Sequence, residues 1–305
     1  MRMVSDSCSE PFVLGTAQLG FDYGVVNRAG KPEFESACEI VSAAWQGGVR
    51  QFDTAQGYGE SEAVLGRIFQ ELHIEGSVKI HTKWSFEKID FASQIEVLFQ
   101  QALDTLKVPV VDTLYAHHFE SYSQMSESAR DGISTLLENG NIKHFGVSVY
   151  DPEEAHSAIK DDLVSVIQLP GNVLDRRFDE SGFIEEASST NTKIFVRSVF
   201  LQGLLLVEAD QVPDHLESLR PAISGWHEFC CRLGVEAAAF AQYFVKIKFG
   251  GTPVIGCDSP AQVTENLRRS CQDTAIYQDA LIAWDSENTD EFSEKLIDPR
   301  SWPKP

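Results

Sequence analysis

The sequence lacks a continuous apolar run of the ~20 residues that a helix needs to cross a bilayer. Its first residues, MRMVSDSCSEPF, also lack the apolar stretch of a signal peptide. The chain has 305 residues, of which 43% are hydrophobic and 23% are charged, a composition typical of a globular protein with a large core. We therefore expect a protein that does not enter membranes and is located in the cytoplasm.

Cysteine is scarce and irregularly spaced. The chain contains no C-x-x-C pair, and its six cysteines are Cys8, Cys38, Cys230, Cys231, Cys257 and Cys271. The adjacent Cys230 and Cys231 fall in a predicted helix, where neighbouring side chains point in different directions. We interpret the cysteines as free thiols that pack as small apolar residues, not as disulfides or zinc ligands.

Positive charge is scarce as well. Lysine and arginine number 25 against 46 aspartates and glutamates, which gives a net charge of −21 and a pI near 4.7. A field of this sign repels polyanions, so we expect neither nucleic acid nor an anionic membrane surface as a partner. A phosphorylated ligand would need local positive charge or helix N-termini to offset this field.

The sequence does contain a repeated alternation of β-rich and helical patterns. The β-rich runs are residues 12–19, 50–54, 78–84, 113–119, 143–149, 165–170, 192–200 and 252–257. Between them the apolar spacing becomes helical, as in residues 61–72 and 93–106, where the apolar side chains form one stripe. Helix start signals occur at residues 151–154 and 259–260, and stop signals at residues 47–48 and 139–140.

Eight strand–helix units predict the α/β class and a single (β/α)8 TIM barrel. A doubly wound sheet, the alternative, would place G-x-G-x-x-G after its first strand. The sequence at residues 15–20 is GTAQLG, which lacks that spacing. We expect one domain over residues 1–305, with a helical tail from about residue 273. This tail either folds against the barrel or also borders the mouth of the site.

Ionisable side chains gather at the carboxyl ends of the predicted strands, the face on which such barrels carry out chemistry. The second strand ends at Asp53 and has Tyr58 in its loop, the third ends at Lys83, and the fourth at His117 and His118. Each residue alone also has a structural explanation, such as capping, packing or surface charge. Their shared position on one rim predicts a catalytic site.

These residue types together fit proton delivery to a carbonyl oxygen. A tyrosine, with a pKa near ~10, is a poor acid at neutral pH, but a nearby lysine cation lowers that pKa. A buried aspartate would keep the lysine charged and oriented, and a histidine could orient the substrate oxygen. No side chain supplies hydride, so a reduction would need a nicotinamide coenzyme.

The stretch FDTAQGYGESEAVLG at residues 52–66 resembles the signature of the aldo-keto reductases. HTKW at 81–84, DTLYAH at 112–117 and GVSV at 146–149 resemble that family in the same order. The similarity runs from about residue 12 to residue 268. It implies a (β/α)8 barrel that catalyses NAD(P)H-dependent reduction of a small-molecule carbonyl, or the reverse oxidation of an alcohol.

By position, the resemblance implies that Tyr58 is the general acid, that Lys83 modulates its pKa, and that Asp53 is the partner of Lys83. His117 would orient the substrate, because it stands five residues after Asp112, the spacing found in the family. The resemblance also suggests that Tyr23, Trp84 and His118 contact the substrate. For Tyr23 and Trp84 the alternative is a packing role.

For the coenzyme, NADP(H) or NAD(H), the resemblance implies contacts at the ends of several strands. They come from Thr16, Ala17, Ser148, Gln168, Arg197, Ser198, Phe200, Leu201, Gly203, Gly256, Asp258, Gln262 and Asn266. Two positions depart from the family pattern. Val149 replaces an asparagine, and Arg197 replaces a tyrosine that stacks on the nicotinamide. The planar guanidinium of Arg197 could stack there or pair with phosphate.

VIGCDSPAQVTEN at residues 254–266 resembles the family's segment before the last barrel helix, with Ile255 in place of proline. A phosphate near that helix start would benefit from its free N–H groups and its dipole. Asp258 stands where NADP-preferring relatives often have a basic residue, and a carboxylate there repels a 2′-phosphate. Arg268 and Arg269 either compensate the negative charge of Asp258 or form a solvated helix face. The sequence is therefore compatible with NADPH and with NADH.

Two other functions fit parts of the pattern. One is a coenzyme-binding regulatory or scaffold subunit of the same fold, but the intact set of Asp53, Tyr58, Lys83 and His117 counts against it. The other is a metal-dependent hydrolase that uses His117 and His118. Adjacent residues on a strand point to opposite faces, so we expect no metal site. A monomer and a small homo-oligomer are both compatible with the sequence.

Overall fold

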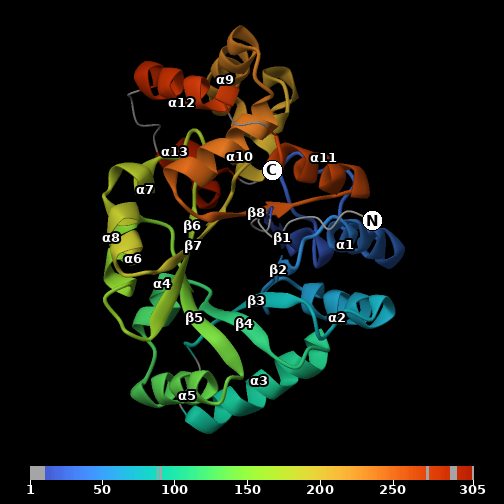
Figure 1. The fold of residues 1–305 in the computed structure, drawn as a ribbon, viewed down its shortest axis with the longest axis vertical. Helices are drawn as coiled ribbons and strands as arrows, with labels where there is room; N and C mark the ends of the chain where they lie inside the picture. Colours follow the sequence, from blue (N-terminus) through green and yellow to red (C-terminus); the bar gives the residue numbers. More distant parts are fainter. Residues whose placement is uncertain (1–10, 88, 90, 273–274, 289–293, 304–305) are drawn as a thin grey trace, which may run out of the picture.

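The computed structural model describes residues 11–87, 89, 91–272, 275–288 and 294–303. Eight strands within these residues form one closed barrel, in which neighbours run parallel and β8 closes on β1. The strands are β1 (Val13–Gly15), β2 (Gln51–Asp53), β3 (Lys79–Trp84), β4 (Val111–Ala116), β5 (Ile142–Ser148), β6 (Val164–Pro170), β7 (Lys193–Arg197) and β8 (Thr252–Gly256). The predicted (β/α)8 barrel is confirmed (Figure 1).

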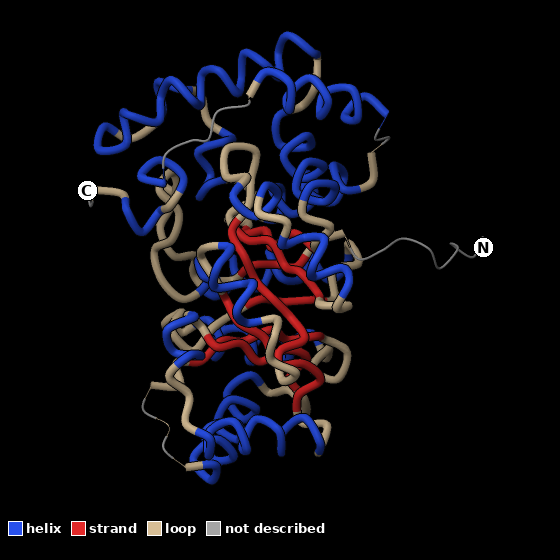
Figure 2. The backbone as a smooth tube through the Cα atoms, turned by 90° about the vertical axis from the view of Figure 1, so that its left-hand side faces the viewer, coloured by secondary structure: helices blue, strands red, loops and turns tan. Residues whose placement is uncertain are grey.

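Helices follow the strands and surround the barrel, as Figure 2 shows. They are α1 (Phe34–Gln46), α2 (Ser61–Leu72), α3 (Ala92–Leu106), α4 (Phe119–Ser123), α5 (Glu127–Glu138), α6 (Pro152–Ala158), α7 (Arg177–Glu180), α8 (Phe183–Ser189), α10 (Ala237–Lys248) and α11 (Pro260–Ser270). Short 3-10 helices are η1 (Ala17–Leu19), η2 (Leu201–Leu206), η3 (Ala209–Gln211) and η4 (Asp214–Leu219). The helices predicted at 61–72 and 93–106 correspond to α2 and α3.

The helix ends follow the start and stop signals of the sequence. Asp151 caps α6 by accepting a hydrogen bond from the Glu154 N–H at 3.0 Å. Ser259 caps α11 in the same way, through the N–H of Gln262 at 3.3 Å. Helix α1 ends before Gly47, and α5 ends before Asn139. Local chemistry therefore decided these boundaries, as predicted.

Three strands end well before their predicted last residues. Strand β1 stops at Gly15, because the N–H groups of Leu19 and Gly20 bond back to local carbonyls and form η1. Strand β7 stops at Arg197, because Ser198 has a φ of 63° and leaves the extended region. Strand β4 ends at Ala116, so the two predicted strand-end histidines lie beyond it.

A second helical layer lies outside the barrel. Helices α9 (Arg220–Leu233) and α12 (Ala275–Glu287) pack together, with the ring centroids of Phe229 and Trp284 4.8 Å apart. Trp284 Nε1 also donates to the Val173 carbonyl at 3.1 Å, which ties the tail to the loop after β6. Residue 273, where we expected the tail to begin, lies outside the described residues, as does Cys8.

Apolar side chains fill the barrel beneath its carboxyl rim. Val13, Tyr115, Val166, Phe195 and Val254 come from five strands and form one buried cluster. The side chains above this cluster are polar, and Lys83 Nζ lies 5.9 Å from the centroid of the Tyr115 ring. The barrel interior therefore forms an apolar base on which a polar site rests. None of the described helices is long and apolar enough to cross a membrane.

The adjacent cysteines on α9 face different environments, as predicted. Cys230 is buried, whereas Cys231 is exposed. Burial raises the pKa of the Cys230 thiol to about 12, which keeps that thiol protonated and unreactive. Cys230 therefore behaves as a small apolar residue of the core.

Candidate active site

Asp53 and Lys83 form a buried ion pair at the carboxyl rim of the barrel. Asp53 is the last residue of β2, and Lys83 is the penultimate residue of β3. Lys83 Nζ lies 2.5 Å from Asp53 Oδ1 and donates to the Thr54 carbonyl at 2.9 Å. Burial lowers the pKa of Lys83, and the Asp53 carboxylate opposes this shift. The two side chains thus have the contact expected of them, and the pair compensates the cost of burying each charge.

Gln168 forms a hydrogen bond with the second carboxylate oxygen of Asp53, a contact that the sequence did not predict. Its Nε2 donates to Asp53 Oδ2 at 2.7 Å. Its Oε1 is buried and has no hydrogen-bond partner among the described residues. A buried acceptor without a partner costs about 1–3 kcal/mol, so this atom suits a donor brought by a ligand. An N–H of a nicotinamide carboxamide is such a donor.

Tyr58 lies in the loop between β2 and α2, directly beside this pair. Lys83 Nζ is 5.0 Å from the centroid of the Tyr58 ring. Backbone bonds from Tyr58 N–H to the Ala55 carbonyl and from Ser61 N–H to the Tyr58 carbonyl hold the loop in a tight turn. These bonds fix the position of Tyr58 beside the ion pair.

The pKa of Tyr58 is shifted in the direction opposite to the expectation. Burial raises the pKa of the phenol above its usual value, the negative charge of Asp53 raises it further, and Arg197 lowers it. We expected Lys83 to lower this pKa. Lys83 is instead paired at 2.5 Å with Asp53, so its charge is largely compensated. Tyr58 is accordingly protonated at neutral pH.

His117 and His118 follow the end of β4 and stack on each other. Their ring centroids are 4.5 Å apart and their planes differ by 4°. The expectation that they point to opposite faces was wrong, because strand alternation ends with Ala116. His117 also meets the Tyr58 ring edge-on at 5.6 Å. Burial, with a smaller effect of the Lys83 cation, lowers the pKa of His117 to about 3, so its ring is neutral.

The described residues contain no group of three or more His, Cys, Asp or Glu side chains that could hold a metal ion. Within these residues, His117 and His118 therefore have no third His, Cys, Asp or Glu side chain with which they could bind a metal ion. The rim of the barrel offers a phenol, an imidazole and a buried ion pair instead. This set fits proton transfer.

The two aromatic residues proposed as substrate contacts have different positions. Tyr23 is 39% exposed and packs edge-on against Phe21, which packs edge-on against Tyr58 at 6.0 Å. Trp84 is only 2% exposed. Its ring centroid lies 6.2 Å from that of Phe86 and 6.2 Å from that of Phe99, which belongs to α3. The expectation for Trp84 was wrong, because its neighbour Lys83 points into the barrel and strand alternation turns Trp84 outward.

Three residues assigned to the coenzyme have buried side chains with contacts inside the protein. Thr16 is fully buried, and its hydroxyl donates to the Asp53 carbonyl at 2.8 Å. Asn266 is 4% exposed, and its amide contacts Gln242 at 2.9 Å and Cys257 Sγ at 3.4 Å. Leu201 is fully buried in the main core. These side chains hold the loops of the rim together.

The loop after β7 has a constrained backbone. Ser198, Leu201, Gln202 and Gly203 have φ values of 63°, 47°, 53° and 91°. Three of these are non-glycine residues in the left-handed region, a conformation that costs of order 1 kcal/mol or more at each residue. A Cβ on Gly203 would stand 2.3 Å from the Val26 side chain, so only glycine fits there. The loop predicted to contact the coenzyme is thus held in an unusual, fixed shape.

Arg197, at the end of β7, reaches across the mouth of the barrel. Its Nη2 donates to the Val149 carbonyl at 3.0 Å, and its Cζ lies 4.0 Å from the centroid of the Tyr150 ring. Arg300, in η5 (Pro299–Ser301), covers the same ring at 3.5 Å. The sequence did not indicate Tyr150 and Arg300 as residues of the site, because no local pattern links residues so far apart. The tail therefore borders the mouth of the site.

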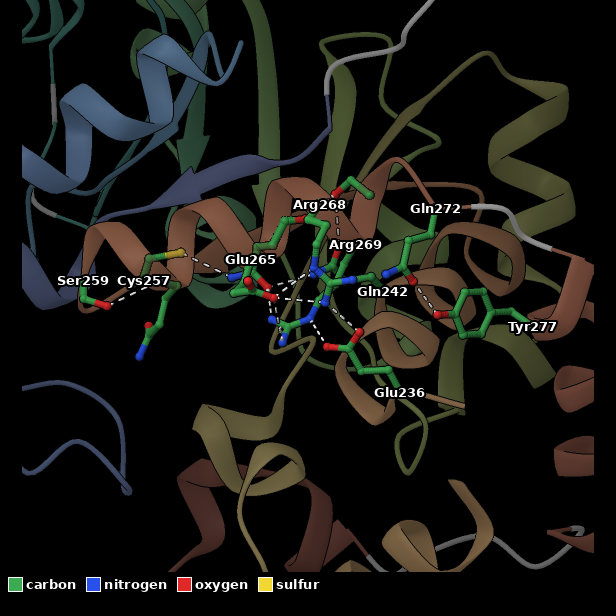
Figure 3. Close-up of polar contacts among 12 residues, drawn as sticks. Glu236, Gln242, Cys257, Ser259, Glu265, Arg268, Arg269, Gln272 and Tyr277 are labelled. Carbon is green, nitrogen blue, oxygen red and sulfur yellow. Dashed lines mark hydrogen bonds and ion pairs between the residues drawn. The ribbon is translucent and has the colours of Figure 1, made fainter. Parts of the chain in front are cut away.

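The two arginines of α11 are engaged by carboxylates, as Figure 3 shows. Arg268 lies 2.8 Å from Glu236 and 3.0 Å from Glu265, and Arg269 lies 2.6 Å from Glu236. Arg269 is 19% exposed, so the expectation of a solvated face holds only for Arg268, at 49%. Asp258 stands at the start of the helix, where its N–H donates to Gln262 at 2.8 Å.

A closed parallel barrel with a phenol, an imidazole and a buried ion pair on its carboxyl rim defines a TIM-barrel protein with groups suited to proton transfer. The model of the aldo/keto reductase family matches residues 11–279, and the chain belongs to that family. This membership confirms the resemblance drawn from the motifs. It places the protein among the oxidoreductases that use a nicotinamide coenzyme.

Individual relatives are distant. The chain is similar to pyridoxal 4-dehydrogenase of Microbacterium luteolum, with 25% identity over 305 residues that cover 83% of this chain and 87% of that protein. The fold is similar to that of glycerol dehydrogenase from Gluconobacter oxydans, with a TM-score of 0.70, 18% identity and 95% of each chain covered. An aldo-keto reductase from Bacillus halodurans gives a TM-score of 0.69 at 17% identity, over 94% of this chain and 95% of that one.

Proposed function

We propose that the protein catalyses reversible hydride transfer between a nicotinamide coenzyme and a small carbonyl or alcohol substrate, with Tyr58 as the general acid or base. One observation carries this proposal. The centroid of the Tyr58 ring lies 5.6 Å from that of the neutral His117 ring and 5.0 Å from Lys83 Nζ. A carbonyl oxygen placed beside Tyr58 and His117 would meet a proton donor and a group that orients it.

The charges of these groups fit the reductive direction. Tyr58 is protonated at neutral pH, so it can donate a proton to the oxygen that becomes an alkoxide. Lys83 Nζ, which Asp53 holds 5.0 Å from the centroid of the Tyr58 ring, offsets part of the negative charge of the phenolate that forms. His117 remains neutral and can hydrogen-bond the same oxygen. The bound coenzyme supplies or accepts the hydride.

The residues present fit such a coenzyme. Gln168 Oε1 is a buried acceptor that lacks a partner among the described residues, and Ser148 pairs with Gln168 in the sheet register. Together they suit the carboxamide of a nicotinamide. We assign further coenzyme contacts to the rim around the β7 loop and the start of α11. These come from Ala17, Ser198, Phe200, Gly203, Gly256 and Gln262.

We further infer that NAD(H) is the preferred coenzyme. Asp258 places a carboxylate at the start of α11, where a 2′-phosphate would meet negative charge. Arg268 and Arg269 could offset that charge only if they were free, and both are paired with Glu236. Ribose hydroxyls, by contrast, can donate to a carboxylate.

A turnover screen tests the proposed activity. Purified protein with NADH or NADPH and a panel of aldehydes and ketones should show coenzyme oxidation, measured by nicotinamide absorbance. The Y58F variant should lose most of this turnover, about a hundredfold or more, while it binds the coenzyme like the wild type. Tight coenzyme binding without turnover on any carbonyl would instead support a regulatory or scaffold subunit.

We also propose a cytoplasmic location and a monomer or small homo-oligomer. The net charge of −21 and the acidic pI favour a partner that is a small molecule over nucleic acid. Size-exclusion chromatography with light scattering would give the oligomeric state directly. A large assembly would contradict this part of the proposal.

A further inference from the structure

We propose that the substrate carries an anionic group, a carboxylate or a phosphate, and that Arg197 binds this group at the mouth of the barrel. In this arrangement Arg300 is a positioning residue, which acts through Tyr150. The inference rests on the proposed function and adds the chemical class of the substrate.

Arg197 is a cation without a counter-charge in a strongly acidic protein. It is partly buried, and within the part of the chain that the structure describes no carboxylate lies within ion-pair distance of it. Its contacts are the Val149 carbonyl at 3.0 Å and the ring of Tyr150 at 4.0 Å. A guanidinium has five N–H donors, and a single bond leaves most of them for a ligand. Their fork matches the two oxygens of a carboxylate or a phosphate.

The position of Arg197 places such an anion next to the reacting groups. Arg197 pairs with Pro170 in the sheet register, two positions beyond Gln168, which binds Asp53. Its charge opposes the rise in the pKa of Tyr58 and adds to the lowering of the pKa of His117, so it lies within electrostatic reach of both. A substrate held by its anionic end at Arg197 can therefore present a carbonyl to Tyr58.

The C-terminal tail fixes this cation. Arg300 Cζ lies 3.5 Å from the centroid of the Tyr150 ring, on which Arg197 also packs. Asp298 is 2% exposed and binds Arg300 through both carboxylate oxygens, at 2.5 Å and 3.0 Å. The charge of Arg300 is thereby compensated, so we assign it the role of holding Tyr150 against Arg197.

The pyrophosphate of the coenzyme is a second anion that the Arg197 guanidinium could bind. A guanidinium that binds this pyrophosphate would change coenzyme affinity and would act equally on all substrates. A guanidinium that binds the substrate anion would leave coenzyme affinity unchanged and would discriminate between charged and uncharged carbonyls. Measurements of coenzyme affinity and of substrate preference therefore distinguish the substrate anion from the coenzyme pyrophosphate.

The experiment compares matched substrates and matched variants. The substrates are succinic semialdehyde against butanal, and glyceraldehyde 3-phosphate against glyceraldehyde. We expect the wild type to favour the anionic member of at least one pair about tenfold or more in kcat/KM. R197Q should remove this preference mainly through KM, R197K should restore part of it, and R300Q should weaken it.

Arg50 provides the matched control. It is also partly buried, donates to the backbone carbonyls of Trp45 and Val49, and packs on an aromatic ring, that of Trp45, at 3.8 Å. It precedes β2 and therefore lies at the amino end of the barrel, opposite the site. R50Q removes the same charge and should leave the substrate preference unchanged.

Two binding measurements complete the test. Nicotinamide fluorescence gives the coenzyme Kd, which R197Q should leave within about twofold of the wild type. Calorimetry gives the affinity of succinate, an unreactive mimic of the semialdehyde, for the coenzyme-saturated protein. We expect succinate to bind the wild type and R50Q but not R197Q.

The inference is overturned if R197Q keeps the wild-type substrate preference and succinate affinity, or if it weakens coenzyme binding and affects all substrates equally. Succinate binding that depends on Arg197 supports the inference even if no carbonyl is turned over. In that case only the proposed oxidoreductase activity fails. The two hypotheses are therefore tested separately.

Discussion

The backbone of Gly20 lies directly against that of Tyr58, so closely that a Cβ on Gly20 would stand 1.7 Å from the Tyr58 carbonyl oxygen. Gly59, with a φ of 56°, approaches Gly20 from the other side, and its own Cβ would stand 2.6 Å from the Gly20 carbonyl oxygen. Two glycines thus allow the loop after β1 to pack on the turn that carries the phenol. The position of Tyr58 depends on residues that take no part in the chemistry.

The first prediction concerns this contact. G20A keeps every reacting side chain, but its methyl group must displace the Tyr58 turn. We expect kcat to fall about tenfold to a hundredfold, because a shift of about 1 Å at a catalytic group is enough for such a loss. Steady-state kinetics and thermal unfolding measure the effect, with G76A as the control, since a Cβ on Gly76 meets no atom within 4 Å. Wild-type kcat in G20A would show that Gly20 does not position Tyr58.

The second prediction concerns the buried pair of Asp53 and Lys83. D53L leaves the Lys83 ammonium buried without a counter-charge, so we expect a loss of about 3–5 kcal/mol in the free energy of unfolding. The double variant D53L/K83M removes both charges and should recover much of this loss, while it stays inactive. Urea unfolding of the two single variants and the double variant gives the coupling energy. Additive effects would argue against a direct interaction in solution.

The third prediction concerns the pH dependence of the two reaction directions. Reduction requires protonated Tyr58, whose pKa lies above its usual range, and neutral His117, whose pKa is lowered to about 3. The reductive kcat should therefore be nearly flat from about pH 5 to pH 9. Alcohol oxidation requires the phenolate and should rise with pH over the same range. A reductive rate that falls between pH 7 and pH 9 would contradict the raised pKa of Tyr58.

The fourth prediction concerns stability in acid. The pKa of His117 is lowered from 6.5 to about 3 in the folded protein. Between these values the unfolded chain binds more protons than the folded one, so the free energy of unfolding decreases as the pH falls from 6.5 toward 3. H117Q should show a shallower decrease than the wild type in urea unfolding at pH 7, 5.5 and 4.5. Equal slopes would mean that His117 does not have this pKa.

The fifth prediction concerns the choice of coenzyme. Titration of the protein with NADH and NADPH, followed by nicotinamide fluorescence, should show tighter binding of NADH. D258N removes the repulsion of a 2′-phosphate and should narrow this preference by strengthening NADPH binding about fivefold. D210N, on the exposed η3, serves as a charge-matched control. A wild type that prefers NADPH would show that Asp258 points away from the ribose or is neutralised.

Local patterns in the sequence determined the barrel and most of its helix ends. The stripe at residues 61–72 became α2 with the same bounds, and Asp151 and Ser259 cap helices as their position before proline predicts. These features could be predicted because backbone periodicity and capping depend on residues within a few positions of each other. The gathering of Asp53, Tyr58, Lys83 and His117 also followed from sequence, since parallel strands in a closed barrel end on one rim.

Only the tertiary structure decided how these side chains meet. Strand alternation turned Trp84 outward, the end of β4 let His117 and His118 stack, and burial raised the pKa of Tyr58. The contact of Arg300 with Tyr150 joins the tail to the loop after β5. Such contacts depend on packing between distant segments and on the exclusion of water, which no short stretch of sequence encodes. The sequence therefore determined the residues of the rim, and the fold determined their charges, directions and neighbours.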